Sequence, residues 1–452
     1  MIKIKNGRVI TPVKGTKDIL DAQMDVYIAE PGEPRAGRIV GLNPTEIPTD
    51  SITREIDATG LLVFPGLVDV HVHFRDPGFT YKEDIETGAK AAAKGGVTTV
   101  VLMANTKPAV DNEETLDYVL QKGRTTDIHV ETCVNVTKGM KGQELVDVEK
   151  LLAKGAVGIT DDGVPILDAA LARKAMELSA KYDIPVSFHE EDPSYIENNG
   201  INHGKASEHF GIGGSDRQAE ISMVKRDLEI ALETGAIMDV QHISSKEAVE
   251  LVRQAKKRPG GENIHAEATP HHFTLTEDAA ILYGTMAKMN PPLREEADRL
   301  AIIEGLKDNT IDMIATDHAP HLLSEKEGGA LKAVSGMPTL QFSLVSIYEL
   351  VHEGILSIEQ LVQKMCHAPA QLYQISQRGF IRPGYQADLV LLNPHKEWTV
   401  TTDCIESKCG WSPMEGRTFH AQVEKTFVNG TAVYENGKVN KAHRGQALRF
   451  ER

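Results

Sequence analysis

The chain has 452 residues, and its 49 Lys and Arg against 65 Asp and Glu give a formal net charge of −16 at pH 7. This balance argues against a protein whose main function is to bind nucleic acid or an anionic membrane. At roughly 100–200 residues per domain, the length predicts two or three domains, or one large barrel with an appendage. No apolar run approaches the roughly 20 residues of a membrane span, no signal-peptide pattern is seen, and four scattered cysteines make no disulfide framework, so we expect a cytoplasmic protein.

The two ends of the chain are rich in short strands and turns. Residues 1–65 and 380–452 contain the tripeptides NGR (6–8), NGT (429–431) and NGK (436–438). Asn-Gly is a strong signal for a hairpin turn, so each of the three predicts a hairpin. We expect the two ends to fold together as a small β-sandwich domain beside the rest of the chain.

Eight near-continuous apolar runs recur within residues 66–379 and alternate with helix-like stretches such as 82–94, 168–182 and 216–234. Apolar runs without alternation are typical of parallel strands covered on both faces. Eight alternating units predict an α/β protein whose core is a (β/α)8 barrel of the TIM type over residues 66–379. The runs are 67–74, 97–105, 128–135, 156–162, 184–191, 236–245, 263–272 and 311–320.

Polar side chains stand at the carboxyl end of nearly every run. In a (β/α)8 barrel these ends form one rim, on which the active sites of such enzymes are built. Strand-capping explains a polar residue on any single strand, but it explains five strands that end in metal-competent side chains poorly. Two long glycine-containing segments, 195–215 and 321–338, are candidate active-site loops.

An HVH sequence on the first barrel strand offers two imidazoles to one ion, because residues i and i+2 of a strand point to the same side. A lone pair of this kind is more often structural, but three more donors end later strands. Nitrogen and oxygen donors together suit zinc. The set consists of His71, His73, His189, His242 and Asp317.

A pair of metals sharing a water needs one more anionic ligand, and the fourth strand ends in Asp161 and Asp162. Two divalent ions lower the pKa of a shared water towards neutrality and polarise a carbonyl, while Asp317 accepts the proton of the attacking group. The pattern predicts metal-assisted hydrolysis of an amide-like bond, or its reversal. The alternative is a set of satisfied rim histidines that hold no metal.

Seven motifs carry a resemblance to a known family: HVHFRDPG (71–78), MANTKP (103–108), TDDG (160–163), HEED (189–192), QHIS (241–244), MNPPLR (289–294) and ATDHAPH (315–321). Together they resemble the dihydroorotases of the amidohydrolase superfamily, and more narrowly the bacterial long-chain class. The resemblance implies reversible hydrolysis of (S)-dihydroorotate to N-carbamoyl-L-aspartate in de novo pyrimidine synthesis. HEED in place of the commoner HCED, and SGMP at 335–338, depart from the family pattern.

The resemblance also implies two zinc ions per chain, bridged by a hydroxide, with Asp317 as the general acid and base. Many superfamily members bridge the metals with a carboxylated lysine, but this class uses an aspartate. Asp162 matches that position, and Asp161 is the neighbouring alternative. The implied ligands are His71, His73 and Asp317 for the first ion, and His189 and His242 for the second.

Arg75 follows the two histidines on the same face of the first strand. In a protein of charge −16, an arginine beside the metals indicates binding of an anionic group, because a guanidinium forks onto a carboxylate. The alternative is a structural ion pair with Asp76 or Glu83. The substrate contacts implied by the resemblance are Arg75, Asn105 and His321 to the carboxylate, Asn290 to the ring, and the backbone of Ser335 and Gly336.

Two other functions compete with this one. The first is another cyclic-amide hydrolase, an allantoinase or a dihydropyrimidinase (hydantoinase), which acts on a ring without a carboxylate. The second is a non-catalytic dihydroorotase-like scaffold for aspartate carbamoyltransferase, although a candidate ligand stands at every metal position. The family also leads us to expect a homodimer and an association with aspartate carbamoyltransferase.

Overall fold

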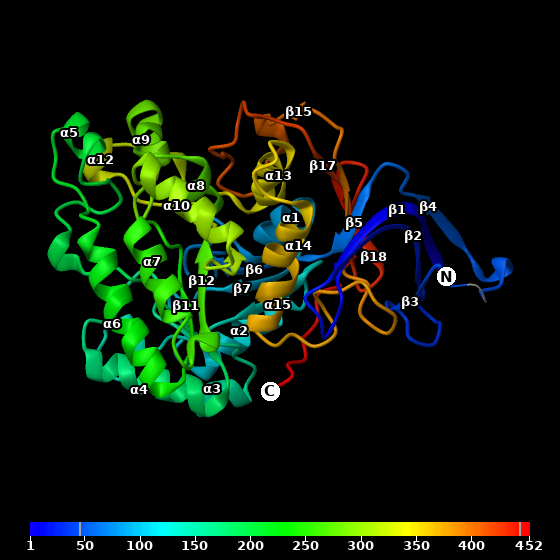
Figure 1. Ribbon diagram of the computed structural model, residues 1–452, viewed down its shortest axis with the longest axis horizontal. Helices are drawn as coiled ribbons and strands as arrows, with labels where there is room; N and C mark the ends of the chain where they lie inside the picture. The colour runs from blue at the N-terminus through cyan, green and yellow to red at the C-terminus, as the bar shows by residue number, and fades with distance from the viewer. Residues whose placement is uncertain (45–46, 443) are drawn as a thin grey trace.

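The computed structural model describes residues 1–44, 47–442 and 444–452 and places an α/β barrel beside a β domain (Figure 1). Each of the eight predicted barrel strands is present inside its predicted run. The strands are β6 (Leu67–Val72), β7 (Val97–Leu102), β8 (His129–Thr132), β9 (Ile159–Thr160), β10 (Pro185–Phe188), β11 (Ile237–Val240), β12 (Ile264–Ala268) and β13 (Met313–Ile314).

The barrel closes through two single bridges between its longer sheet segments. Strands β6 to β8 form one parallel segment and β9 to β13 the other. Parallel bridges join Val72 to His318 at one seam and Val134 to Ile159 at the other. All eight strands therefore run in the same direction around one closed barrel, which confirms the predicted fold class.

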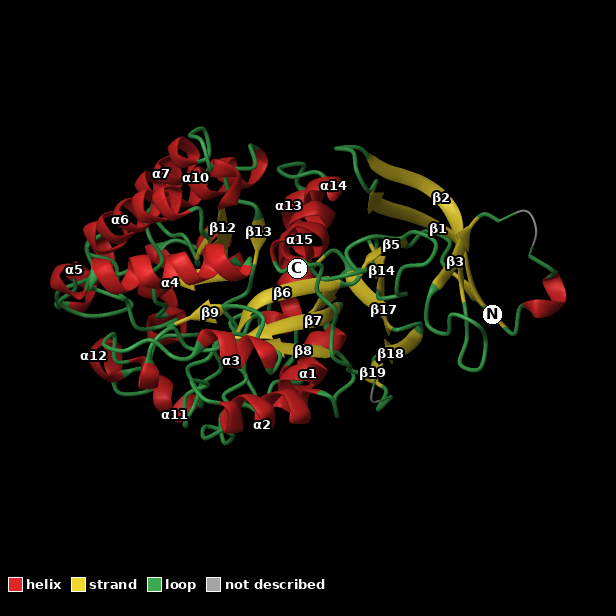
Figure 2. Ribbon diagram, turned by 90° about the horizontal axis from the view of Figure 1, so that it is seen from below, coloured by secondary structure: helices red, strands yellow, loops and turns green. Residues whose placement is uncertain are grey.

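Helices cover the outside of the barrel (Figures 1 and 2). The three helix-like stretches correspond to α1, α4 and α6, and α1 begins with a capping box between Asp84 and Thr87. The α-helices are α1 (Ile85–Lys94), α2 (Glu113–Gly123), α3 (Val148–Ala153), α4 (Ala169–Tyr182), α5 (Lys205–Phe210), α6 (Gln218–Thr234), α7 (Lys246–Ala255), α8 (Pro270–Thr274), α9 (Glu277–Tyr283), α10 (Glu296–Lys307), α11 (Leu323–Lys326), α12 (Gly329–Lys332), α13 (Ser343–His352), α14 (Ile358–Val362) and α15 (Ala368–Leu372). Shorter helices are η1 (Thr49–Ser51), η2 (Lys138–Met140), η3 (Pro193–Tyr195), η4 (Gly261–Asn263), η5 (Gly284–Ala287), η6 (Leu340–Phe342), η7 (Gln363–His367, a π-helix) and η8 (Thr402–Cys404).

The β domain draws its strands from both ends of the chain. Its main sheet has the order β19-β18-β17-β14-β5-β1-β2-β3, with β4 paired to β1, and β5 from the N-terminal part pairs antiparallel with β14 from the C-terminal part. The strands are β1 (Ile2–Pro12), β2 (Ile19–Ile28), β3 (Ile39–Leu42), β4 (Arg54–Asp57), β5 (Leu62–Pro65), β14 (Leu389–Asn393), β17 (Gln422–Val428), β18 (Thr431–Glu435) and β19 (Lys438–Val439), and a separate hairpin joins β15 (Trp398–Thr399) to β16 (Thr418–Phe419).

Two of the three predicted Asn-Gly hairpins are present, and the prediction of the third, at residues 6–7, is wrong. Residues 429–430 join β17 to β18 and residues 436–437 join β18 to β19, with positive φ at both positions of each turn. Asn6 and Gly7 instead lie inside β1, where the register with β2 shifts. Because β1 is paired on both edges, the strand continues and the Asn-Gly pair is absorbed as a bulge.

The last residues of the chain return to the barrel. Ile375 forms a bridge with Phe450, and the Arg452 guanidinium donates to the carbonyl of Val157 at 2.5 Å, just before β9. Gln446 lies within 3.3 Å of the imidazole of His129, the first residue of β8. The chain end therefore packs beside the amino ends of the barrel strands, opposite the rim on which the sequence places the site. Among the described residues, no helix has both the length and the apolar character needed to cross a membrane.

Candidate functional site

Four imidazoles gather at the carboxyl ends of β6, β10 and β11. His71 and His73 lie at the end of β6, His189 directly follows β10, and His242 follows β11 by two residues. The ring centroids are 5.3 Å apart for His71 and His73, 5.3 Å for His71 and His242, and 4.9 Å for His189 and His242. The structure thus brings together histidines that are up to 171 positions apart in sequence, as the convergence of parallel strand ends requires.

Asp162 lies in the middle of this group. Its Oδ1 is 3.5 Å from Nε2 of His71 and 3.6 Å from Nε2 of His242. The same oxygen is 3.8 Å from Nδ1 of His189, while Oδ2 is 3.4 Å from Nε2 of His73. Burial raises the pKa of this carboxyl, but the imidazoles of His71 and His242 outweigh burial and hold the pKa well below its usual range.

Asp161 is turned away from the imidazoles. Its Oδ1 accepts hydrogen bonds from the backbone N–H of Val136 at 2.9 Å and of Thr137 at 3.2 Å, and its Oδ2 accepts from the Thr137 hydroxyl at 2.5 Å. These contacts satisfy the carboxylate locally and tie the end of β9 to the chain that follows β8. Of the two aspartates left open by the sequence, Asp162 is the one whose side chain faces the histidines.

Asp317 completes the group from the loop after β13. Its Oδ1 is 2.9 Å from Nε2 of His73 and 3.6 Å from Nε2 of His71. Burial raises the pKa of this carboxyl. The hydrogen bond from His73 and the charge of His71 lower the pKa by more than burial raises it, so the pKa lies below the usual range. Asp317, His242 and Arg75 have φ values of 45°, 33° and 58°, a region that non-glycine residues rarely adopt and that is typical of functional sites.

The donor atoms that remain without partners fit a metal site. Glu267 Oε1 lies 2.5 Å from Nδ1 of His71, which places the ring proton there and leaves the fully buried Nε2 without a hydrogen bond. Nδ1 of His242 is also buried and without a hydrogen bond. Two sets of three ligand atoms lie close enough to hold an ion: His71, His73 and Asp317, and His71, Asp162 and His242. The unpartnered Nε2 of His71 faces Asp162 and Asp317, which is the expected chemistry of such a site, whereas His242 faces Asp162 through Nε2, which lies 3.0 Å from Nδ1 of His189.

Neighbouring side chains orient the other two imidazoles. The Asn105 Oδ1 lies 3.0 Å from Nδ1 of His73, and its amide nitrogen is 3.3 Å from Oδ2 of Asp162. Nε2 of His189 lies 3.0 Å both from Oε2 of Glu191 and from the amide nitrogen of Asn290. Such contacts fix which ring nitrogen faces the ion. The sequence analysis missed the contact of Glu267 with His71, and its only signal was an acidic residue near the end of β12.

A cavity of about 380 Å³ opens above the cluster. His71 lies beneath its floor, whereas the other predicted ligands and every predicted substrate contact line it. The substrate contacts among the lining residues are Arg75, Asn105, Asn290, His321, Ser335 and Gly336.

Arg75 has no carboxylate partner among the residues that the structure describes. Its Nε donates to the carbonyl of Pro320 at 3.3 Å, and its Nη2 lies 3.2 Å from Nε2 of His321. Asp76 pairs instead with Lys122 at 2.5 Å, and Glu83 accepts from the Ser407 hydroxyl and the backbone N–H of residue 408. The alternative of a structural ion pair with either acid is therefore wrong.

His321 lies between two cations at the edge of the cavity. The Lys82 ammonium is 3.1 Å from its Nδ1, on the side opposite Arg75, and also pairs with Glu325 at 2.8 Å. Burial, followed by repulsion from Arg75 and Lys82, lowers the pKa of His321 to about 2, so this imidazole is neutral. The corner of the cavity beside Arg75 is therefore positively charged in a protein that is negative as a whole.

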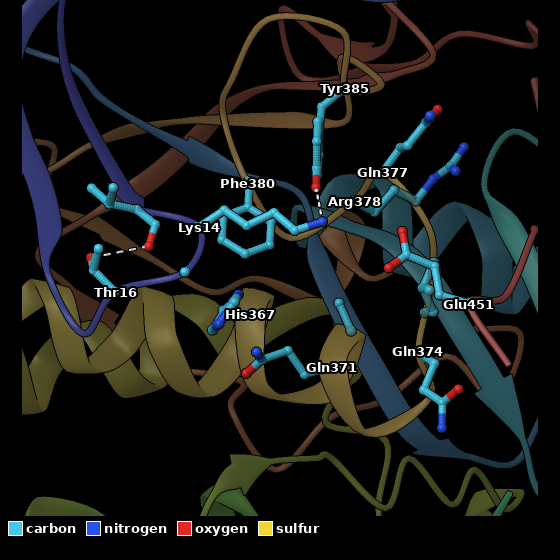
Figure 3. Close-up of a pocket in the computed structure, with 14 residues that line it drawn as sticks. Lys14, Thr16, His367, Gln371, Gln374, Gln377, Arg378, Phe380, Tyr385 and Glu451 are labelled. Atoms are coloured by element: carbon cyan, nitrogen blue, oxygen red, sulfur yellow. Dashed lines mark hydrogen bonds between the residues drawn. The ribbon is translucent and has the colours of Figure 1, made fainter. Parts of the chain in front are cut away.

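A second cavity, of about 440 Å³, lies between the β1–β2 turn, α15 and the chain end (Figure 3). Lys14 reaches across it to donate to the Tyr385 hydroxyl at 3.0 Å, with Phe380 and His367 at its wall and Glu451 opposite (Figure 3). None of the predicted site residues lines this cavity. Its size alone does not make it the site, because the convergent donors lie in the other cavity.

Comparison with known proteins agrees with this geometry. Residues 62–433 match the amidohydrolase family. Two similar curated relatives are named dihydroorotase: that of Clostridioides difficile (strain 630), 50% identical over 435 residues, and that of Clostridium acetobutylicum, 45% identical over 437 residues, each covering 96% of this chain and 100% of the relative.

Similar solved structures are hydantoinases. L-hydantoinase (dihydropyrimidinase) from Arthrobacter aurescens is 26% identical, with a TM-score of 0.86 and 99% of both chains covered. D-hydantoinase (dihydropyrimidinase) from a Thermus species is 24% identical, with a TM-score of 0.82 over 100% of this chain and 99% of that one, and shows the shared fold. By sequence, fold and arrangement of strand-end histidines, the chain belongs to the amidohydrolase family.

Proposed function

We propose that the chain is a zinc-dependent dihydroorotase, which interconverts (S)-dihydroorotate and N-carbamoyl-L-aspartate in pyrimidine biosynthesis. Identity of 50% to a curated dihydroorotase over nearly the whole chain supports this function. The observation that carries it is Arg75, a half-buried guanidinium at the cavity that no described carboxylate neutralises. Such a group requires an anionic partner, and the substrate carboxylate supplies one.

The substrate carboxylate binds at the positive corner of the cavity. Arg75 offers its forked donors, and Asn105 and His321 also line the cavity, His321 in contact with Arg75. Asn290, whose Oδ1 is buried and unpartnered, is free to accept a hydrogen bond from a ring N–H. The backbone of Ser335 and Gly336 also lines the cavity, with Gly336 beside His321.

The donor set would hold two zinc ions: His71, His73 and Asp317 would bind one, His189 and His242 the other, and Asp162 would offer a carboxylate to both. When bound, such ions lower the pKa of a shared water and polarise the amide carbonyl. His71 and His73 are held in their binding orientation by Glu267 and Asn105.

Asp317 moves the proton. In the hydrolytic direction its carboxylate takes the proton of the attacking water and delivers it to the ring nitrogen as the C–N bond breaks. In the biosynthetic direction it removes a proton from the carbamoyl nitrogen as that nitrogen attacks the side-chain carboxyl carbon, and it returns the proton to the departing hydroxyl, which leaves as water. Its carboxylate is ionised at neutral pH and can accept the proton, and its pKa below the usual range favours release of that proton to the ring nitrogen.

The two competing functions make different demands on the site. A hydantoinase or an allantoinase opens a ring without a carboxylate and would leave Arg75 without a partner. A non-catalytic scaffold has no need of the unpartnered Nε2 of His71, which faces Asp162 and Asp317. Both features therefore favour catalysis on a carboxylated ring.

A ring-opening assay on zinc-loaded protein tests the proposal, with dihydroorotate, dihydrouracil and allantoin side by side. We expect turnover of dihydroorotate alone. Arg75→Met should raise KM for dihydroorotate at least about 100-fold, because a charge-assisted contact is lost, while leaving the zinc content unchanged. Arg124→Met, which removes a half-buried arginine bonded to Val130 and Glu131 away from the cavity, is the matched control and should leave KM unchanged. Turnover of a neutral ring, or loss of zinc in the Arg75 variant, would contradict the proposal.

The same function predicts the partners and the location. As a dihydroorotase the chain would act in the cytoplasm as a homodimer and associate with aspartate carbamoyltransferase. Light scattering of the purified protein, alone and mixed with that enzyme, tests both associations by mass.

A further inference from the structure

Two buried lysines lie behind the segment that closes the catalytic cavity. Lys326, on α11, is 1% exposed, and Lys288, just before the predicted ring contact Asn290, is 5% exposed. Neither forms an ion pair with any described carboxylate, although an unpaired buried ammonium group is costly. We therefore ask which backbone conformation the hydrogen bonds of these two ammonium groups stabilise.

Both ammonium groups bind backbone carbonyls of the same short segment. Lys326 Nζ donates to the carbonyls of Val334 at 2.9 Å and Gly336 at 2.8 Å. Lys288 Nζ donates to the carbonyls of Ala330 at 2.8 Å and Ala333 at 2.7 Å. The two lysines are also tied together, because Lys326 Nζ lies 3.3 Å from the carbonyl of Lys288. Together the two buried ammonium groups bind four carbonyls of the 330–336 segment, those of Ala330, Ala333, Val334 and Gly336.

The direction of these carbonyls fixes the direction of the N–H groups. In a planar trans peptide the C=O of one residue and the N–H of the next point in opposite directions. Because the carbonyl of Val334 points at Lys326, the N–H of Ser335 points away from it. In the described part of the chain this N–H forms no backbone hydrogen bond, whereas those of Val334 and Gly336 are both bonded. Ser335 lines the cavity, so its N–H is a donor left available there.

We propose that Lys326, supported by Lys288, is a positioning residue that aims the backbone N–H of Ser335 into the cavity to bind the anionic group of the substrate. The inference rests on the proposed function for the identity of that group. Lys326 does not touch substrate; it acts through the 333–336 segment. Gly336 fits this arrangement, because its φ of 123° and the 2.8 Å between a built Cβ and the Ala319 carbonyl exclude a side chain where the segment approaches the loop after β13.

A third buried lysine provides a matched control. Lys364 is 1% exposed and donates to the carbonyl of Ile311 at 2.7 Å and to Asn309 at 3.1 Å. Burial lowers the pKa of both lysines, to about 7 for Lys326 and about 8 for Lys364. Lys364 lies on η7, and its partners Asn309 and Ile311 directly precede β13, so it lies at the amino end of that strand and does not line the catalytic cavity. Lys364 therefore resembles Lys326 in its burial and in its hydrogen bonds to backbone carbonyls, but it does not contact the segment that lines the catalytic cavity.

The experiment compares Lys326→Met with Lys364→Met by amide hydrogen exchange and by kinetics on the zinc-loaded enzyme. Lys326→Met should speed exchange of residues 333–337 and raise KM for dihydroorotate at least about tenfold, with a smaller fall in kcat and unchanged zinc content. Lys364→Met should lower the thermal midpoint without changing KM or exchange in that segment. If Lys326→Met does not fold, Lys288→Met provides the same comparison with two of the carbonyl bonds removed.

Equal changes in KM for the two variants, or wild-type KM and exchange in Lys326→Met, would overturn the inference. If the wild-type enzyme does not turn over dihydroorotate, the proposed function fails. The exchange of residues 333–337 then decides by itself whether Lys326 holds the segment, so the two failures are distinguishable.

Discussion

The two ends of the barrel strands differ in the side chains that gather there. At the carboxyl ends, buried nitrogens of His71 and His242 have no hydrogen bond, and Asp162 lies among four imidazoles. At the amino ends, the returning chain end packs Leu448 and Phe450 against an apolar cluster that includes Tyr373. One end of the same strands carries clustered imidazoles and carboxylates, while apolar side chains of the chain end pack at the other.

This difference separates function from stability. Buried polar atoms without partners lower stability, so an unpartnered imidazole nitrogen among convergent metal-competent side chains is expected where a ligand completes it. In (β/α)8 barrels the carboxyl rim carries the chemistry and the amino end contributes to stability. Substitutions at the two ends should therefore change different measurements.

The largest effect should come from Asp162. Asp162→Ala removes the carboxylate shared by both sets of ligands, so turnover of dihydroorotate should fall by about 10³-fold or more and bound zinc should decrease. Asp161→Ala, its neighbour, leaves the N–H groups of Val136 and Thr137 without their acceptor and should lower the free energy of unfolding by about 1–3 kcal/mol. Zinc analysis, turnover and denaturant unfolding of both variants check this. Loss of zinc in the Asp161 variant alone would reverse the assignment.

The barrel and most of the rim were predictable because each depends on local patterns that the fold then aligns. Each apolar run marks one strand, and parallel strands bring their carboxyl ends together wherever they lie in the sequence. His71, His73, His189 and His242 were thus identified with no knowledge of the distances between them.

Features that depend on distant partners were not predictable in this way. The three Asn-Gly pairs have the same local preference, yet Asn6 and Gly7 form a bulge because β1 is paired on both edges. Asp161 and Asp162 are adjacent and chemically identical, and only the contact with Thr137 shows which one turns away. Lys326 had no signal, because its partners are backbone carbonyls, which no residue type reveals.

A smaller effect is expected at the amino end of the barrel strands. Leu448 is 8% exposed within the apolar cluster, so Leu448→Ala should lower the free energy of unfolding by about 2–5 kcal/mol through lost burial and the cavity left behind. KM and kcat for dihydroorotate should not change. Leu282→Ala, which truncates a leucine that is 72% exposed, is the control and should change neither measurement appreciably. A kinetic defect in the Leu448 variant with normal stability would break the separation of the two ends.

The smallest effect is expected in the second cavity, which is the sharpest test of the comparison because it is no smaller than the catalytic one. Lys14 is exposed, and its hydrogen bond is to the neutral Tyr385 hydroxyl. Lys14→Met should therefore change the free energy of unfolding by less than about 0.5 kcal/mol and leave KM and kcat unchanged. Denaturant unfolding and the dihydroorotate assay measure both. A rise in KM would mean that this cavity is coupled to the rim. The presence of clustered imidazoles and carboxylates would then no longer be enough to distinguish the catalytic cavity from another cavity of similar size.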